Sequence, residues 1–272
     1  MITFDDNYRL EDFGFRAYME HEHEAVPSIK RKTIPIPGRP GSWNFGSEIG
    51  ERHFNIPLKV TDHDRIELQR KQNAFVAFLF DEFGKPRPIK MTFDYEPDKY
   101  YTVEISSFVS PGNAIHFFRT MGLPLVASDP MKYASANEYD PKENYLYDRD
   151  YMYDIGLMYD NPKSFEWVYE KHYSGINNYS TLVADFVIEI QGTVTNPSVT
   201  NLNDGTKLTL PGISNGRLLI DGNTYSVTRN GQDILEGSNY NFFNIQPGEV
   251  GFLFEGENPN ATVTYKWLHK FM

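Results

Sequence analysis

The chain has 272 residues, which is enough for two ordinary domains, and its hydrophobic fraction of 40% and charged fraction of 23% are typical of a globular protein. Its net charge of −11 repels phosphate backbones and so argues against a nucleic-acid partner. The absence of cysteine excludes disulfides, thiolate metal sites and cysteine nucleophiles.

Neither a secretory signal nor a membrane-spanning helix is expected from the sequence. Residues 1–6 carry acids where a signal has basic residues followed by an apolar run. The longest apolar run, residues 75–80, is far shorter than the roughly 20 residues of a spanning helix. We therefore predict a mature protein without a membrane partner.

Residues 34–60 contain proline and glycine too often for helix interiors, which predicts short strands joined by tight turns. A capping signature at residues 61–64 precedes a segment without proline or glycine, so we predict a helix over residues 62–83, ended by Gly84 and Pro86. Its buried stripe is expected to contain Leu68, Gln72, Phe75 and Leu79, broadened by Ala74 and Phe78, with Arg65, Arg70 and Lys71 on the solvated face.

After the helix, residues 89–94 and 101–105 alternate apolar and polar side chains, which predicts a hairpin with residues 96–98 at its turn. Residues 116–126 form a further predicted strand, which ends at residues 129–133. The next segment, residues 134–180, is acidic, polar and rich in tyrosine, and this composition indicates a linker or an insertion. Its rings either contact a neighbouring subunit or pack on their own domain.

From residue 186 onward, six short strands separated by turns predict a β-sandwich, at residues 186–190, 207–210, 217–220, 225–227, 251–254 and 261–265. Asp221-Gly222 and Asn230-Gly231 are expected hairpin turns, because both central residues of a type I′ turn need positive φ. The predicted fold is mainly β with one α-helix. Its parts are a β-rich N-terminal domain (1–133), a tyrosine-rich linker or insertion (134–185) and a C-terminal β-sandwich (186–272).

Two patterns look like functional sites, and we interpret both as structural. His21 and His23 would project from one face of a strand, but no third ligand is nearby and the spacing is not that of a helical zinc motif. Residues 38–41 (GRPG) lack the lysine and helix of a phosphate-binding loop, so a turn is expected. We predict no catalytic, cofactor-binding or metal-binding residue, no cofactor, and no enzymatic activity.

Several short motifs occur in an order that resembles the distal tail proteins of siphophages and related prophages. Residues 36–41 (IPGRPG) are similar to that family's proline-glycine-arginine-x-glycine turn, with Pro40 in place of the usual acid. Further similar pieces cover nearly the whole chain: Phe45-Gly46, residues 50–52, Gln72 to Leu79, residues 98–101, residues 129–133, Gly192-Thr193, Pro197, residues 219–221 and residues 244–248. The tyrosine-rich residues 134–180 are left out of this alignment with the family pattern.

This resemblance implies an N-terminal domain that assembles into a homo-hexameric ring and an outer C-terminal sandwich similar to galectins and carbohydrate-binding modules. The ring would connect the tail tube protein to the tail-tip hub and receptor-binding apparatus. The implied location is the virion, at the phage tail tip, after assembly in the cytoplasm of the bacterial host. Surface carbohydrate is a further candidate partner.

Two alternatives belong to other functional classes. The first is a carbohydrate-binding module, in which Trp267, Tyr240, Phe242 or Phe243 stacks on a sugar, although core packing is the commoner fate of such rings. The second is a cell-wall hydrolase, which needs two carboxylates that converge about 5–10 Å apart in a cleft.

Overall fold

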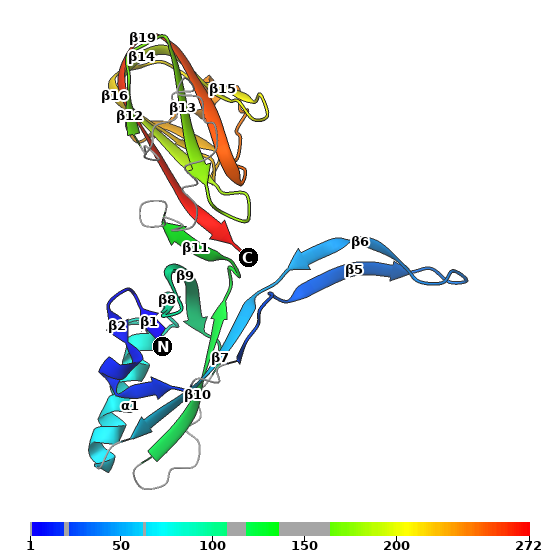
Figure 1. The fold of residues 1–272 in the computed structure, drawn as a ribbon, viewed down its shortest axis with the longest axis vertical. Coiled ribbons are helices and arrows are strands. Elements are labelled where there is room, and N and C mark those ends of the chain that lie inside the picture. The colour runs from blue at the N-terminus through cyan, green and yellow to red at the C-terminus, as the bar shows by residue number, and fades with distance from the viewer. Residues whose placement is uncertain (1, 19–21, 62–63, 108–117, 136–163) are drawn as a thin grey trace, which may run out of the picture. The chain divides into compact units, whose positions relative to one another are not determined.

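The chain divides into two compact units, Met1–Tyr133 with Met272, and Ala134–Phe271 (Figure 1). The computed structural model describes residues 2–18, 22–61, 64–107, 118–135 and 164–272. These residues form mostly antiparallel strands with one α-helix, which confirms the predicted fold class. Within this described part, no helix has the length and apolar character needed to cross a bilayer.

The N-terminal unit contains one helix, α1 (Arg65–Leu79), a short 3-10 helix, η1 (Leu10–Phe13), and these strands: β1 (Ile2–Phe4), β2 (Tyr8–Arg9), β3 (Phe15–Ala17), β4 (Glu22–His23), β5 (Ile29–Pro35), β6 (Ser42–Ile49), β7 (Arg52–Thr61), β8 (Ile89–Phe93), β9 (Glu96–Ile105) and β10 (Phe118–Ala127). A further strand, β11 (Lys132–Ser135), pairs Tyr133 with Tyr100 of β9. The strand predicted over residues 116–126 is β10, and residues 116 and 117 lie outside the described residues.

Strand β7 is the centre of the N-terminal unit. It pairs antiparallel with β10 along its full length, from Thr61 opposite Phe118 to Arg52 opposite Ala127, and on its other side with β3 and β4. Its alternate side chains, from Phe54 to Val60, are buried in a core that includes α1 and β8. The two-residue period of a strand thus turns one face of β7 inward.

The helix α1 begins later and ends earlier than the predicted span of 62–83. The Asp64 carboxylate accepts a hydrogen bond from the Ile66 N–H at 2.9 Å and caps the first turn. The helix ends at Leu79 because Phe80 is extended and forms a β-bridge with Pro86. The helix therefore ends before Gly84, the residue that the sequence predicted as its stop. The buried stripe is confirmed for Leu68, Gln72, Phe75 and Leu79, and Phe78 is partly buried, but Ala74 is exposed.

The predicted hairpin after α1 is present as β8 and β9, but its turn was placed wrongly. Phe93 pairs with Glu96, so the turn is Asp94-Tyr95 and residues 96–98 belong to β9. Glu96 is held in the strand by Lys132 at 2.8 Å and Lys99 at 3.0 Å. Burial alone raises the pKa of Glu96, but hydrogen bonds and charge from the two lysines outweigh burial and lower the pKa.

The C-terminal unit contains another short 3-10 helix, η2 (Leu235–Gly237), and these strands: β12 (Ser164–Trp167), β13 (Lys171–Asn178), β14 (Phe186–Asn201), β15 (Lys207–Thr209), β16 (Ile213–Asp221), β17 (Ser226–Arg229), β18 (Gln232–Asp233) and β19 (Gly248–Phe271). Strands β12 and β13 lie inside the range 134–185 that the sequence predicted as linker or insertion. Both pair with β19, and Trp167 and Ile176 enter the core. Residues 136–163 of that range lie outside the described residues.

Two long strands, β14 and β19, run along the one continuous sheet whose strands enclose the C-terminal core. The first part of β14 pairs with β16 and with β19 around residues 260–267, whereas its last residues pair with β15 and with β19 around residues 252–255. Register shifts in β14 separate the two parts, as expected where a strand bends within a sheet. The predicted strands 251–254 and 261–265 are therefore two parts of one strand, β19.

Gly192 occupies the bend of β14 because no side chain fits there. Its φ is +142°, and a Cβ atom would lie 2.3 Å from the carbonyl oxygen of Asn260. The turn predicted at Asn230-Gly231 is confirmed, with φ of 51° and 82° between β17 and β18. The one predicted at Asp221-Gly222 is wrong: Asp221 pairs with Ser226, so the connection is a longer loop.

Separate cores predict separate unfolding of the two units. Phe75→Ala is expected to lower the unfolding free energy of the N-terminal unit by about 3–5 kcal/mol, because Phe75 is 1% exposed and the two buried clusters share no residue. Scanning calorimetry should show a shift of one transition only. The neighbouring exposed position gives the control, since Val76→Ala should change stability by about 0.5 kcal/mol or less. An equal shift of both transitions would contradict independent units.

Candidate functional site

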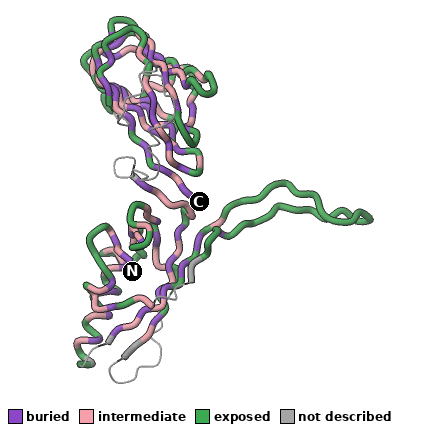
Figure 2. Tube along the Cα trace, viewed as in Figure 1, coloured by how far each residue is buried: buried purple, intermediate pink, exposed green. Residues whose placement is uncertain are grey.

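A two-stranded hairpin of β5 and β6, here called the arm (residues 29–49), projects from the N-terminal unit (Figure 1). All seven residues of β5 and all eight of β6 are exposed, as the continuous green of the arm in Figure 2 shows. At the base of the arm, Gly50 N–H donates to the Ser28 carbonyl oxygen at 2.7 Å, so the two ends are adjacent. The arm therefore takes no part in the core of its own unit.

One face of the arm is apolar. The register pairs Ile34 with Trp43, which places the two side chains on the same face, and Phe45 follows two residues later on that face. The exposed fractions of these side chains are 57%, 51% and 65%. An extra residue in β6, between Asn44 and Ser47, is accommodated at Gly46, whose φ is +108°.

The charge of the arm is opposite to that of the rest of the chain. Residues 29–49 contain four basic side chains and one acidic side chain, a net charge of +3. Since the whole chain carries −11, the remainder carries −14. The Arg39 guanidinium lies 5.0 Å from the centre of the Trp43 ring, so positive charge borders the apolar face directly.

Such an arm has the physical features of a docking surface. An isolated two-stranded hairpin is marginally stable in water, because neither face is covered. Large apolar side chains clustered on an exposed face mark interaction sites. The sequence predicted the strands and the turn at residues 36–41, but not that the other described residues leave them uncovered. The run Lys30-Arg31-Lys32 was the available signal, since consecutive charges leave neither face of a strand suitable for burial.

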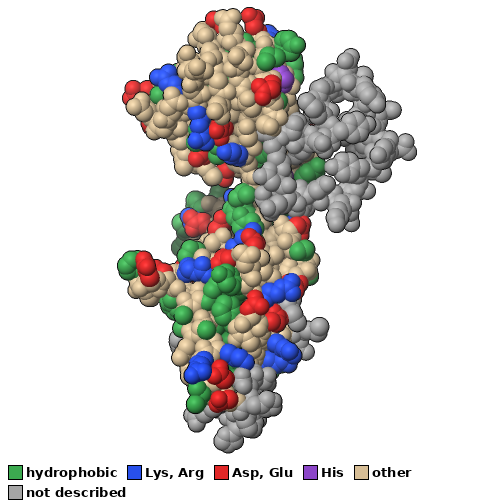
Figure 3. All heavy atoms as spheres, turned by 90° about the vertical axis from the view of Figure 1, so that its left-hand side faces the viewer, with side chains coloured by type: hydrophobic (Ala, Val, Ile, Leu, Met, Phe, Trp, Pro, Cys, Tyr) green, Lys and Arg blue, Asp and Glu red, His purple; other side chains and the backbone are tan. Residues whose placement is uncertain are grey.

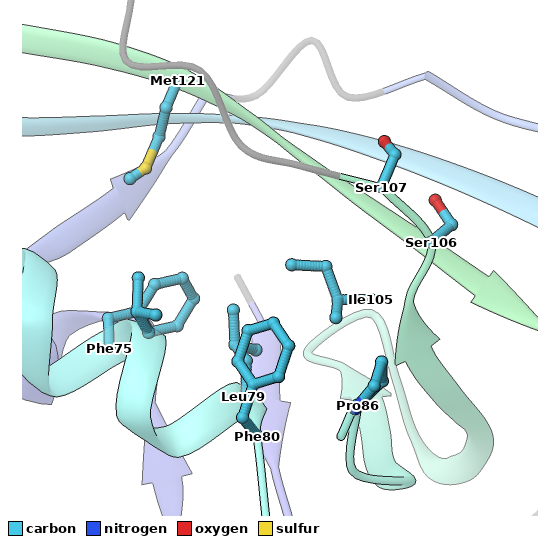
Figure 4. A pocket seen from close by; sticks show the side chains of 9 residues that line it. Phe75, Leu79, Phe80, Pro86, Ile105, Ser106, Ser107 and Met121 are labelled. Carbon is cyan, nitrogen blue, oxygen red and sulfur yellow. The ribbon is translucent and has the colours of Figure 1, made fainter. Parts of the chain in front are cut away.

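A groove of about 490 Å³ lies beside α1 in the N-terminal unit (Figure 4). We call it the α1 groove, and it is lined by Phe75, Val76, Leu79, Phe80, Pro86, Ile105, Ser106, Ser107 and Met121. Phe75 and Leu79 are buried, whereas Val76 is 47% exposed. The lining is almost entirely apolar, which suits an apolar ligand or side chain.

An aromatic surface adds to the apolar character of the α1 side. The rings of Phe13 and Phe78 lie 5.0 Å apart, and the Tyr8 ring lies 5.2 Å from Phe78. Arg87 lies over Phe78 at 4.6 Å and forms an ion pair with Asp5 at 2.9 Å. Figure 3, which views the molecule from the side where α1 lies in Figure 1, shows hydrophobic side chains gathered on this unit.

Arg52 follows the arm directly and anchors its base. The side chain is 1% exposed, and its guanidinium donates a hydrogen bond to the Tyr101 hydroxyl and lies 5.2 Å from the ring centre. Burial raises the pKa of Tyr101, more than Arg52 lowers it. This contact fixes the start of β7, so the direction in which the arm leaves the unit is determined by the core.

The sequence contains two patterns that look like functional sites, the histidine pair and the glycine turn. His21 lies outside the described residues, and His23 is on β4. Among the residues that the structure describes, no group of three or more histidine or acidic side chains is arranged to hold a metal. Residues 38–41 lie in the turn at the tip of the arm and lead into β6 rather than a helix, as predicted for a structural turn.

The rings considered for sugar stacking do not form one open platform. Trp267 and Phe243 are 6% and 4% exposed and belong to the C-terminal core, and Phe242 packs against that core. Of the four, Tyr240 is the exposed ring, at 57%.

Two carboxylates of the C-terminal unit are each held by two cations on the surface of its sheets. Glu189 pairs with Arg217 and with Lys266 at 2.8 Å, and Glu255 pairs with Lys207 at 2.7 Å and Lys171 at 3.0 Å. Hydrogen bonds from these cations lower the pKa of both carboxyl groups. Groups held in the ionised form are poor general acids, so these two do not resemble the acid of a glycosidase pair.

A buried polar cluster of Asn178, Ser180 and His269 lies in the C-terminal unit. Its residue types resemble a catalytic set, but its hydrogen bonds have a structural role, because they join separate segments of the unit. The Asn178 side-chain oxygen accepts from the Ser180 hydroxyl and from His269 Nδ1 at 3.2 Å, and its amide nitrogen donates to the Ile245 carbonyl at 3.0 Å. Because the Ser180 hydroxyl donates to Asn178 and not to His269, the histidine is not placed as its base.

The comparisons with known proteins identify the class of the N-terminal unit. Residues 8–115 match the family model described as a phage tail protein RIFT-related domain. No curated protein matches the chain. The crystal structure of the Dit protein of phage SPP1 matches with a TM-score of 0.68 and 18% identity, over 100% of this chain and 98% of that chain. A chain of the activated baseplate of phage P2 matches with a TM-score of 0.47 and 12% identity, over 99% and 98%.

Residues 8–115 therefore resemble a phage tail protein domain. The whole chain has the fold of a Dit protein, as the resemblance in its sequence predicts. The domain match includes the arm, β7 and α1. It ends before the C-terminal unit, so the galectin-like character of that unit stays a prediction.

The hydrogen bonds of Asn178 predict that its substitution lowers the stability of the C-terminal unit. Asn178→Ala is expected to destabilise the C-terminal unit by about 1–3 kcal/mol for each buried group that loses its partner. Urea denaturation measures the change. The control is Asn241→Ala, because Asn241 is exposed and should change stability by about 0.5 kcal/mol or less. Equally small effects of both substitutions would show that the cluster does not stabilise the C-terminal unit.

Proposed function

We propose that this chain is a structural component of a phage or prophage tail tip, where it forms a homo-hexameric ring between the tail tube and the tail-tip hub. The observation that carries the proposal is the arm, which is fully exposed, apolar on one face and part of a phage tail protein domain. A ring needs a contact surface on each subunit that is incomplete in the monomer. The arm meets that requirement.

The partners follow from the family resemblance. They are a second copy of this chain, the major tail tube protein, the hub or tail-associated protein, and the receptor-binding protein. The SPP1 protein is described as a paradigm of the hub adsorption apparatus in phages that infect Gram-positive bacteria, which supports a place at the tail tip for this chain. The proposed location is the virion, after assembly in the cytoplasm of the host.

Removal of the arm is predicted to abolish the proposed ring. Replacement of residues 29–49 by an Asn-Gly turn joins two ends that are already adjacent, so both units should still fold. The variant is expected to be a monomer, whereas the intact chain forms six copies of 31.5 kDa, about 189 kDa. Light scattering gives the mass, and electron microscopy gives the symmetry. A variant that still forms the ring would contradict the role of the arm.

The chain is proposed to have no enzymatic activity and no tightly held cofactor. Purified protein is expected to release no product from peptidoglycan or teichoic acid and to carry no stoichiometric metal after gentle purification. Product release and elemental analysis are the measurements. Stoichiometric zinc that is lost in a His21→Ala, His23→Ala variant would contradict the second part, and turnover of cell walls would contradict the first.

A further inference from the structure

We propose that the C-terminal unit binds a neutral saccharide chain at two of its loops, residues 222–225 and 238–247, through the exposed rings of Tyr225 and Tyr240. This inference goes beyond the proposed ring and does not depend on it, because the whole site lies in one unit of a single copy. Its starting point is the backbone conformation of the two tyrosines.

Both tyrosines have a backbone conformation that bulky residues rarely adopt. Tyr225 has a φ of 52° and Tyr240 has a φ of 60°, so both lie in the left-handed region. In the described part of the chain, the other non-glycine residues with positive φ are all asparagine or aspartate, the types that tolerate this region best: Asp5, Asp6, Asn196, Asn215, Asn230 and Asn258. Strain of this kind persists where the surrounding structure enforces it, and it concentrates at binding sites.

The strained backbone does not bury either ring. Tyr225 is 56% exposed and Tyr240 is 57% exposed. By contrast, Phe243 in the same segment is 4% exposed and stacks on Phe186 at 4.8 Å, as expected for a ring that serves the core. The fold therefore holds two aromatic rings in water at a conformational cost. A ligand that stacks on the rings gives them a function that core packing does not.

The two loops meet at Phe242. Its ring packs against the core and also contacts the Tyr225 ring edge-to-face, with centroids 5.5 Å apart and planes at 88°. The Phe242 N–H donates to the Tyr240 carbonyl oxygen at 3.0 Å, so the second loop turns back tightly between these residues. The sequence suggested Tyr240 and Phe242 as stacking rings but not Tyr225, whose place beside Phe242 depends on the fold.

Hydrogen bonds to side chains fix both loops in place. In the first loop, the Asp221 carboxylate accepts from the Asn223 N–H at 2.8 Å. In the second, the Asn239 side-chain oxygen accepts from the Thr209 N–H at 3.0 Å, and its amide nitrogen donates to the Lys207 carbonyl oxygen at 2.8 Å. A ligand that binds loops already held in this way does not have to order them, which lowers the entropy cost of binding.

The residues around the rings indicate the class of ligand. Residues 222–225 and 238–247 contain no charged side chain, and they include the exposed amides of Asn223 and Asn241. Amides both donate to and accept from hydroxyl groups, and an aromatic face suits the apolar C–H face of a sugar ring. A phosphate-rich polymer is disfavoured, since these loops hold no cation to pair with it and the chain carries a net charge of −11. A neutral saccharide fits both the rings and the amides.

Glycine variants test the rings without straining the backbone. Glycine adopts positive φ freely, so Tyr225→Gly and Tyr240→Gly in the full-length chain are each expected to leave the melting temperature level or raise it. Each is expected to weaken saccharide binding by about tenfold or more, because an exposed aromatic anchor is lost. Tyr225→Phe and Tyr240→Phe keep the stacking face and should bind within about threefold of the parent chain.

The matched control is Tyr169→Ala. Tyr169 is 70% exposed on the connection between β12 and β13, and its substitution should leave saccharide binding unchanged. The probes are oligosaccharides of glucose, galactose, rhamnose or N-acetylglucosamine, with poly(glycerol phosphate) as the anionic comparison. Saturation-transfer NMR titrations give the affinities, and thermal melts give the stability of each variant.

Binding of a neutral oligosaccharide that both glycine variants lose, and that both phenylalanine variants and the Tyr169 variant retain, supports the site. Tighter binding of poly(glycerol phosphate) overturns the ligand class, and binding that persists in the glycine variants overturns the site. The inference is also overturned if none of the neutral probes binds. A clear fall in the melting temperature of both glycine variants shows that the rings serve the fold, and has the same consequence. The proposed ring is unaffected by each of these results.

Discussion

The antiparallel pairing of β7 with β10 is the contact on which the N-terminal unit depends. It holds one face of β7 against α1 and β8, and the alternating side chains of β7 then supply the centre of the core. Arg52, the first residue of β7, is fixed on Tyr101 at the point where the arm leaves. A rigid core thus carries the surface that is proposed to bind the next subunit, with no disulfide or thiolate metal site to help it.

The C-terminal unit depends on two long strands that must bend in compatible ways. β14 and β19 pair along most of their length within one sheet, so the sheet can enclose the core only if both strands bend at compatible places. Gly192 allows one bend by leaving room for Asn260, and the Asn178 cluster connects the end of β19 to the loop after β13. Buried hydrogen bonds of this kind specify a single arrangement, because any slip leaves polar groups unpaired.

Local pattern predicted much of this fold. The buried stripe of α1 except Ala74, the extended segments from residue 186 onward and the turn at Asn230-Gly231 followed from periodicity or from the needs of positive φ, but the pattern did not show that residues 251–254 and 261–265 belong to one strand. Strands β12 and β13 were missed because their partner residues in β19 lie at least 70 positions away in the sequence, and composition in a tyrosine-rich segment does not reveal distant pairing. The exposure of the arm was missed for the opposite reason, since a strand pattern tells nothing of whether anything covers the strand.

The bulge at Gly46 affects how readily the arm of a free chain aggregates. A hairpin with two free edges is a template for strand addition and hence for aggregation. In the arm, the extra residue interrupts the regular ladder, Pro35 removes one donor from the edge, and residues 30–32 add like charges along it. Edge-to-edge pairing between newly made copies is thereby disfavoured, while the apolar face stays open. The free chain is thus protected against forming fibres through the edges of its arm.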